Sequence, residues 1–99
     1  MAIVAVSIAP VGGEVSVSKY VAKALDVLEE SGLDYELGPM FTTIEGDPDE
    51  IFATIREMQE AVFAEGAERV GTVMKVDDRR DKTHTMRGKM ESVREKRGK

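Results

Sequence analysis

Residues 33–45 read Leu-Asp-Tyr-Glu-Leu-Gly-Pro-Met-Phe-Thr-Thr-Ile-Glu, and the fold depends on this stretch. It contains two short strand-like runs, residues 33–37 and 40–45, which flank the dipeptide Gly38-Pro39. Glycine and proline do not continue a strand ladder smoothly, so the dipeptide marks a tight connection. Two consecutive strands with no helix between them are therefore expected in the middle of the chain.

An amphipathic helix is expected immediately before this pair of strands. Apolar residues recur at helical spacing from Val17 to Leu28, and Gly32 provides a left-handed stop after them. Ser16 and Ser18 are both positioned to cap the start of this helix. The pattern predicts that the helix ends at Gly32, directly before the first strand of the pair.

A second helix is expected immediately after the pair. Asp47 stands at the cap, Pro48 at the first helical position and Glu50 three residues after the cap, an arrangement similar to a capping box. The helix should run to about Glu65 and end at Gly66. Its inner face is predicted from four apolar residues at helical spacing: Ile51, Ile55, Met58 and Val62.

Two further strands frame these elements. Residues 2–9 are small or β-branched and are bounded by Pro10 and the pair Gly12-Gly13, and residues 69–76 alternate in polarity. The resulting order is strand, helix, strand, strand, helix, strand. It predicts an α+β, ferredoxin-like βαββαβ sandwich, in which two helices cover one face of a four-stranded antiparallel sheet. Residues 1–99 are expected to form a single domain of this fold.

An extra C-terminal helix is expected over residues 83–96. Its apolar stripe of Met86, Met90 and Val93 is narrow, so it should be helical only when it is docked on another surface. Residues 1–78 carry 5 basic and 16 acidic side chains, a charge of −11, whereas residues 79–99 carry 9 and 3, a charge of +6. We therefore expect charge to hold the tail against its own body or a neighbouring subunit.

The composition limits the compartment and the chemistry. The chain has no cysteine, which excludes a disulfide framework, a thiolate nucleophile and a thiolate metal site. Residues 1–10 have no basic segment and too short an apolar run for a signal peptide or a membrane span, so a cytoplasmic location is expected. Acylphosphatase, an enzyme activity found on this architecture, relies on a catalytic Asn, and the chain contains none.

Several binding chemistries lack the residues they need. His84 is the only histidine, and a metal site built from nitrogen or sulfur ligands needs another such group. Gly12-Gly13 does not belong to a phosphate-binding motif. Residues 69–76 contain no aromatic side chain on which RNA bases would stack, so a nucleic-acid partner is not expected, although RNA contact through the basic tail stays an alternative. No catalytic residue, cofactor or metal is predicted.

The second face of the sheet has no helix to cover it. If Val4, Val6 and Ile8 face the helices, alternation places their neighbours on the open face. Such a surface suits a partner sheet with a small-molecule pocket between the two sheets. Its predicted members are small, apolar or singly polar: Ala5, Ser7, Ala9, Phe41, Thr43, Glu45, Gly71, Val73 and Lys75.

Residues 76–81, Val-Asp-Asp-Arg-Arg-Asp, form the segment richest in charge. Asp77 or Asp78 is expected to cap the last helix. Arg79 and Arg80 are expected to pair with carboxylates of the same subunit or a neighbouring one. Direct contact of this segment with a ligand is the main alternative.

Three motifs of the chain resemble the small thiamine-binding protein family. They are residues 18–22 (Ser-Lys-Tyr-Val-Ala), residues 38–46 (Gly-Pro-Met-Phe-Thr-Thr-Ile-Glu-Gly), and residues 69–70 followed by 75–81. The resemblance covers nearly the whole chain. It implies a non-enzymatic, cytoplasmic protein of ferredoxin-like fold that forms dimers and tetramers through its sheets and binds thiamine or its hydroxymethylpyrimidine part. The chain departs from the family pattern at Phe41, where the pattern has Gly, and at Gln59, where it has His.

The open face offers a mechanism for such binding. An aminopyrimidine presents a donor and ring-nitrogen acceptors, so Glu45 is expected to bind its amino group or ring nitrogen, with Ser7 and Thr43 completing the polar contacts. Phe41 would stack on the ring or fill the space that the ring needs. The structural alternative pairs Glu45 with Lys75. The functional alternative is a ligand-sensing or protein-interaction module that holds a different small ligand near residues 38–41.

Overall fold

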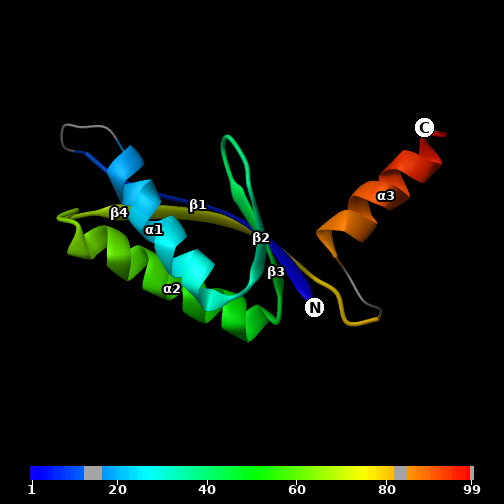
Figure 1. Cartoon of the computed structure of the whole chain (residues 1–99), viewed down its shortest axis with the longest axis horizontal. Coiled ribbons are helices and arrows are strands. Elements are labelled where there is room, and N and C mark those ends of the chain that lie inside the picture. Colours follow the sequence, from blue (N-terminus) through cyan, green and yellow to red (C-terminus); the bar gives the residue numbers. More distant parts are fainter. Residues whose placement is uncertain (13–16, 82–84, 99) are drawn as a thin grey trace.

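The computed structural model describes residues 1–12, 17–81 and 85–98, and Figure 1 shows their arrangement. A strand and a helix come first, and a hairpin of two strands follows. A second helix, a fourth strand and a third helix complete the described chain. In order, the elements of the described chain are β1 (Ala2–Pro10), α1 (Ser18–Ser31), β2 (Asp34–Leu37), β3 (Thr42–Gly46), α2 (Pro48–Ala64), β4 (Val70–Asp78) and α3 (Met86–Lys96).

The strands form one sheet in the order β2-β3-β1-β4, and every neighbouring pair is antiparallel. β1 pairs with β4 along all nine of its residues but with β3 only as far as Val6, which faces Thr42. α1 and α2 lie side by side on one face of this sheet (Figure 1). The predicted α+β, ferredoxin-like sandwich with an extra C-terminal helix is confirmed.

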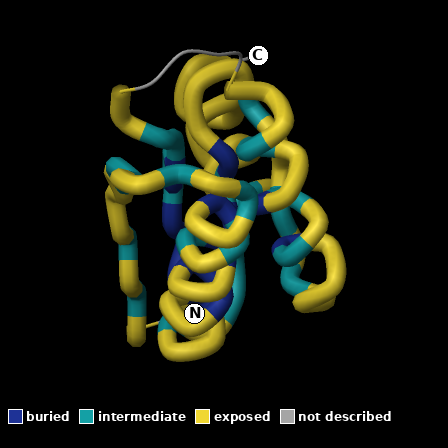
Figure 2. Tube along the Cα trace, turned by 90° about the vertical axis from the view of Figure 1, so that its left-hand side faces the viewer, coloured by how far each residue is buried: buried dark blue, intermediate teal, exposed yellow. Residues whose placement is uncertain are grey.

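The hydrophobic core lies between the sheet and the helices α1 and α2. Along β1 the side chains of Val4, Val6 and Ile8 are buried, as the alternation predicts, and the four predicted inner residues of α2 are buried as well. Figure 2 shows that the buried segments lie inside the body while the helices expose their outer sides. The largest side chains that are almost completely buried are Leu28, Ile44, Ile51, Ile55, Val4 and Val62.

The helix ends follow their sequence signals, with one exception. The side chain of Asp47 accepts a hydrogen bond from the N–H of Glu50 at 3.1 Å and so caps α2, as predicted. Gly32 ends α1 in the left-handed conformation, at φ 77°. The prediction that Ser18 caps α1 is wrong, because Ser18 is the first helical residue and Val17, which has no side chain able to cap, stands before it. Ser16 and Gly13 lie outside the described residues.

The hairpin between β2 and β3 is tighter than its sequence indicates. We predicted that the second strand begins at Met40, but β3 begins at Thr42. The N–H of Gly38 donates to the carbonyl oxygen of Phe41 at 3.0 Å, which places Met40 and Phe41 in the turn. A Cβ atom at position 38 would lie 2.5 Å from the oxygen of Phe41, so this turn requires glycine.

The junction between β4 and α3 also differs from the prediction. β4 continues to Asp78, so Asp77 and Asp78 are strand residues and do not cap the last helix. The cap is Thr85, whose side chain accepts a hydrogen bond from the N–H of Gly88 at 2.9 Å. β4 is longer than predicted because β1 pairs with it as far as Ala2, the first residue of β1, which faces Asp78. His84 lies outside the described residues.

α3 lies beyond the end of the sheet, away from α1 and α2 (Figure 1), and contributes to a longest dimension of 47 Å. Met86 is half-buried, but Met90 and Val93 are 63% and 51% exposed. The expected packing of Met90 and Val93 on the body of the same chain is therefore wrong. Their contact with a neighbouring subunit stays a prediction.

The packing predicts a large difference between two leucine substitutions. Leu28→Ala should lower the free energy of unfolding by about 2–5 kcal/mol, because it removes a side chain that is completely buried and leaves a cavity. The matched change Leu37→Ala should cost less than about 1 kcal/mol, because Leu37 is 63% exposed. Urea unfolding at one fixed protein concentration measures both values, and equal losses would contradict the described core.

Candidate ligand-binding site

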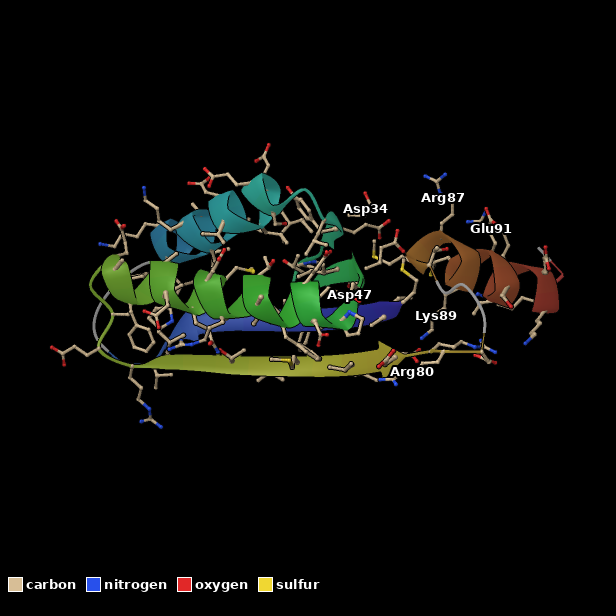
Figure 3. All side chains as sticks on the ribbon, turned by 90° about the horizontal axis from the view of Figure 1, so that it is seen from below. Asp34, Asp47, Arg80, Arg87, Lys89 and Glu91 are labelled. Atoms are coloured by element: carbon tan, nitrogen blue, oxygen red, sulfur yellow. The ribbon has the colours of Figure 1, made fainter. Side chains whose placement is uncertain are left out.

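A cavity of about 440 Å³ lies where the hairpin of β2 and β3 approaches the start of α3. Its volume falls within the range of about 300–1,000 Å³ that is usual for small-molecule sites. Asp34 of β2 and Arg87 of α3 both line it, and Figure 3 labels the two residues. Its lining residues are Asp34, Tyr35, Glu36, Glu45, Thr85, Met86 and Arg87.

Strand alternation brings three carboxylates to this cavity. In the register of β2 with β3, Asp34 faces Glu45 and Glu36 faces Thr43, so Asp34, Glu36 and Glu45 share the sheet face opposite Ile44 and the core. Within the described part of the chain, no ion pair joins any of the three to a lysine or arginine. Arg87 is the one cation among the described residues of the lining, so these residues together carry an excess of negative charge.

Two contacts hold the first turn of α3 against β3 and β4, the strands on either side of β1. The backbone N–H of Met86 donates to Oε2 of Glu45 at 2.8 Å, and the ammonium group of Lys89 pairs with Asp77 at 3.0 Å. Glu45 and Asp77 are the two register partners of Ile3, on β3 and β4 respectively. Ile3 belongs to the open face yet is only 8% exposed, which fits a helix start lying over it. The carboxylate at the N-terminus of α3 also complements the helix dipole.

The segment that follows β4 contains local ion pairs. Arg79 and Asp81 form a bidentate contact with distances of 2.6 and 3.0 Å, and Arg80 pairs with Asp78 at 3.3 Å. The hydrogen bond to Asp81, supported by the charges of Asp81 and Asp77, raises the pKa of Arg79 above its usual value. Solvent screens these exposed pairs, so they orient the chain and add little stability.

A second, smaller hollow lies at the other end of β3. It has a volume of about 140 Å³ and lies between β1, α1 and the hairpin turn, and we refer to it as the hairpin groove. Its walls are mainly apolar and include Val21 and Leu25 of α1 with Leu37 and Phe41 of the hairpin. The stretch of β1 from Val6 to Ile8 forms its floor.

The predicted ligand residues are divided between these two places. Glu45 lines the acidic cavity, whereas Ser7 and Phe41 line the hairpin groove, and Thr43 lines neither. Phe41 and Glu45 are four positions apart, a separation of roughly 13 Å along an extended chain. One pyrimidine ring does not reach both. The alternative ion pair of Glu45 with Lys75 is absent from the described contacts, since Glu45 accepts the N–H of Met86 instead.

Asp34, Glu36 and Arg87 were not predicted as site residues. A sequence signal for the first two existed, because alternation along residues 34–37 places them on the face of Glu45 once Tyr35 is assigned to the core side. No local signal indicated Arg87, since its approach to β2 is a long-range contact. The three carboxylates do not form a group that could hold a metal ion, and no such group occurs elsewhere in residues 1–12, 17–81 and 85–98.

Comparison with known proteins identifies the relationship. A family model described as thiamine-binding protein matches residues 4–94. The chain belongs to the thiamine-binding protein family. Among its relatives, the UPF0045 protein YqgV of Bacillus subtilis (strain 168) is 47% identical over 98 residues and is matched over 94% of each chain.

Solved structures share the fold of this chain. A hypothetical protein from Methanocaldococcus jannaschii is 38% identical, with a TM-score of 0.85 over 93% of this chain and 94% of that chain. A proposed thiamine biosynthesis or salvage protein from Thermotoga maritima has a TM-score of 0.80 over 94% and 98%, at 22% identity, which shows the shared fold alone. Among the described residues, no helix has the length and apolar character of a membrane span.

The contact between Glu45 and α3 predicts a local effect at the edge of the cavity. Glu45→Ala removes the acceptor of the Met86 N–H, so hydrogen exchange at the Met86 amide should accelerate by about tenfold or more, as expected for a lost bond to a charged group. The control Glu36→Ala removes a carboxylate of the same cavity that makes no such bond. NMR exchange rates measure both variants, and an unchanged Met86 rate in Glu45→Ala would contradict this anchoring.

Proposed function

We propose that this member of the thiamine-binding family binds thiamine or its hydroxymethylpyrimidine part in the acidic cavity at Glu45. The observation that carries the proposal is the convergence of Asp34, Glu36 and Glu45 on one cavity, in which Arg87 is the one cation among the described lining residues. The family match over residues 4–94 supports the ligand class. The Thermotoga protein of the same fold, which is described in terms of thiamine biosynthesis or salvage, is in line with it.

Thiamine suits this cavity because its thiazolium ring has a permanent positive charge. A carboxylate attracts such a cation most strongly where water is partly excluded, and Glu45 is the half-buried member of the three. Glu45 has a second oxygen besides the one that accepts from Met86. Asp34 and Glu36 are more exposed and supply attraction at the entrance. The amino group of the pyrimidine is an alternative donor to the same carboxylates.

The proposed role is binding without catalysis. The hydroxyl group of Thr85, which lines the cavity, already caps α3 by accepting the N–H of Gly88. In the described part of the chain, no hydrogen bond joins this hydroxyl to a carboxylate of the cavity, the arrangement that would activate it as a nucleophile. A binding protein that stores or delivers a cofactor needs no such activation. We place this role in the cytoplasm.

The binding unit is proposed to be a homo-oligomer. Val73 on the open sheet face is 62% exposed, and on α3 Met90 and Val93 line a hollow of about 240 Å³ together with Arg94 and Arg97. A basic, partly apolar helix complements the acidic body of a second copy both in charge and in hydrophobic character. A neighbouring copy that covers α3 would also steady the side of the acidic cavity that α3 forms.

Calorimetric titration with thiamine tests the proposed ligand. The wild-type chain should bind thiamine, and Glu45→Gln should weaken binding by about tenfold or more, because it removes a charge from the half-buried acceptor. The control Glu57→Gln changes the net charge equally at an exposed position of α2 that does not line the cavity. Absence of heat with both thiamine and hydroxymethylpyrimidine at millimolar concentration would sink the proposed function.

The role of α3 in assembly has its own test. Replacing Met90 and Val93 together by Ser should lower the mass measured by light scattering after gel filtration, because it removes the exposed apolar residues of this helix. Replacing Glu91 and Glu95 by Ser on the same helix is the control and should leave the mass unchanged. An unaltered oligomer in the Met90 and Val93 variant would show that α3 does not hold the subunits together.

A further inference from the structure

Arg87 is a basic residue in the lining of an otherwise acidic cavity. It borders the space of about 440 Å³ together with Asp34, Glu36 and Glu45. Among the described residues, the ion pairs of the chain include none between Arg87 and these carboxylates. Charges of both signs therefore border one cavity without forming an ion pair, and a ligand with a charge of one sign matches only part of the lining.

The turn of α3 that carries Arg87 is held in place on both sides of it in the sequence. The N–H of Met86 donates to Glu45 at 2.8 Å, and Lys89 pairs with Asp77 at 3.0 Å. A retreat of Arg87 from the cavity would break at least one of these contacts. The side chain of Arg87 is exposed, so rotation about its own bonds is enough to bring the guanidinium group to a ligand.

The hydroxyl group of Thr85 is a second donor in the same wall of the cavity. Its oxygen accepts the N–H of Gly88 at 2.9 Å, but a hydroxyl that accepts one hydrogen bond still has a proton to donate. Thr85 is half-buried and lines the cavity beside Arg87. The start of α3 therefore contributes two donors to the lining, whereas β2 and β3 contribute the carboxylates.

A phosphate ester is the kind of anion that such donors recognise. It carries a charge of about −1.5 to −2 near neutral pH and has three acceptor oxygens. The planar fork of a guanidinium group can donate to two of these oxygens at once. A thiazolium ligand whose hydroxyl group is esterified with phosphate would thus offer a cation to the carboxylates and an anion to α3. The unesterified alcohol offers α3 only a neutral oxygen.

We propose that Arg87 determines specificity by making the cavity favour the phosphate ester of thiamine over thiamine itself. The carboxylates of Asp34, Glu36 and Glu45 attract the thiazolium ring, and Arg87 and Thr85 donate to the phosphate oxygens. Arg87 also acts against thiamine without a phosphate, because its positive charge then lies near another cation with no anion between them. The inference rests on the proposed function for the site, and it names the form of the ligand.

Calorimetric titration of the full chain with thiamine monophosphate and with thiamine tests this preference. The titrations are run well above the second pKa of a phosphate ester, which is about 6. The wild-type chain should bind the monophosphate at least about threefold more tightly than thiamine, a modest factor because Arg87 is exposed and solvent screens its charge. Tighter or equal binding of thiamine would overturn the inference and leave the proposed function intact.

Variants of Arg87 separate specificity from a merely structural role. Arg87→Gln should abolish the preference, whereas its affinity for thiamine should be unchanged or higher, because a repulsive charge is lost. The control Arg69→Gln changes the net charge equally at an exposed position outside the described lining and should keep the preference. Arg87→Lys, which keeps the charge without the planar fork, should restore part of it. Equal weakening of both ligands in Arg87→Gln, or a preference that survives it, would overturn the assigned role.

NMR on the ¹⁵N-labelled chain then locates the two ligands. Thiamine monophosphate should shift the Nε–H signal of the Arg87 side chain more than thiamine does, since only the monophosphate provides an anionic acceptor. Shifts by both ligands that are confined to the hairpin groove would place them outside the acidic cavity and overturn both proposals. A chain that binds neither ligand would also overturn both, whereas binding of the monophosphate alone, lost in Arg87→Gln, would support this inference and contradict thiamine as the ligand.

Discussion

β1 is the strand on which the rest of the structure depends. Its nine residues pair with β4 along their whole length, but the hairpin turn at Gly38 stops β3 after five pairs. The unequal lengths give the sheet two unlike ends. At the end where β3 is missing, the edge of β1 forms the floor of the hairpin groove. At the other end β3, β1 and β4 are all present. There Glu45 of β3 and Asp77 of β4 hold the first turn of α3.

The charge of the chain is also distributed unevenly, between the part up to the end of β4 and the C-terminal part that contains α3. Residues 1–78 carry a charge of −11 and residues 79–99 carry +6, yet the described contacts between the two parts at the end of the sheet are few. Glu45 satisfies a backbone N–H of α3, and Asp77 pairs with Lys89. Among the described residues, most acidic side chains therefore form no ion pair with a basic side chain, and the acidic surface keeps a field that attracts cations.

The order of elements could be predicted because it depends on local signals. The alternation of Val4, Val6 and Ile8 and the cap at Asp47 act over a few residues, and the structure contains both. The prediction was wrong where a tertiary contact decides the outcome. β4 continues through Asp77 because β1 is there to pair with it, and residues 40–41 leave the strand because the turn at Gly38 closes on Phe41.

The same reasoning explains what could be predicted of the site. Glu45 was a candidate because strand alternation places it on the open face, and it lines the larger cavity. Its separation from Phe41 was not predicted. Alternation indicates which face of the sheet a residue occupies, but not whether two residues on that face lie at the same end of the strand. The wall of the cavity that α3 supplies depends on a contact between residues 41 positions apart in the sequence, Glu45 and Met86, for which no local pattern exists.

The position of α3 also has a consequence for the order of folding. Its two anchors, Glu45 and Asp77, lie on different strands and come together only after β3 and β4 have both paired with β1. Contacts between distant parts of a chain form slowly because a long loop must close first. A helix of 11 residues has little stability by itself in water, so α3 has no platform until the sheet is complete. We therefore expect the C-terminal helix to be the last element to become ordered.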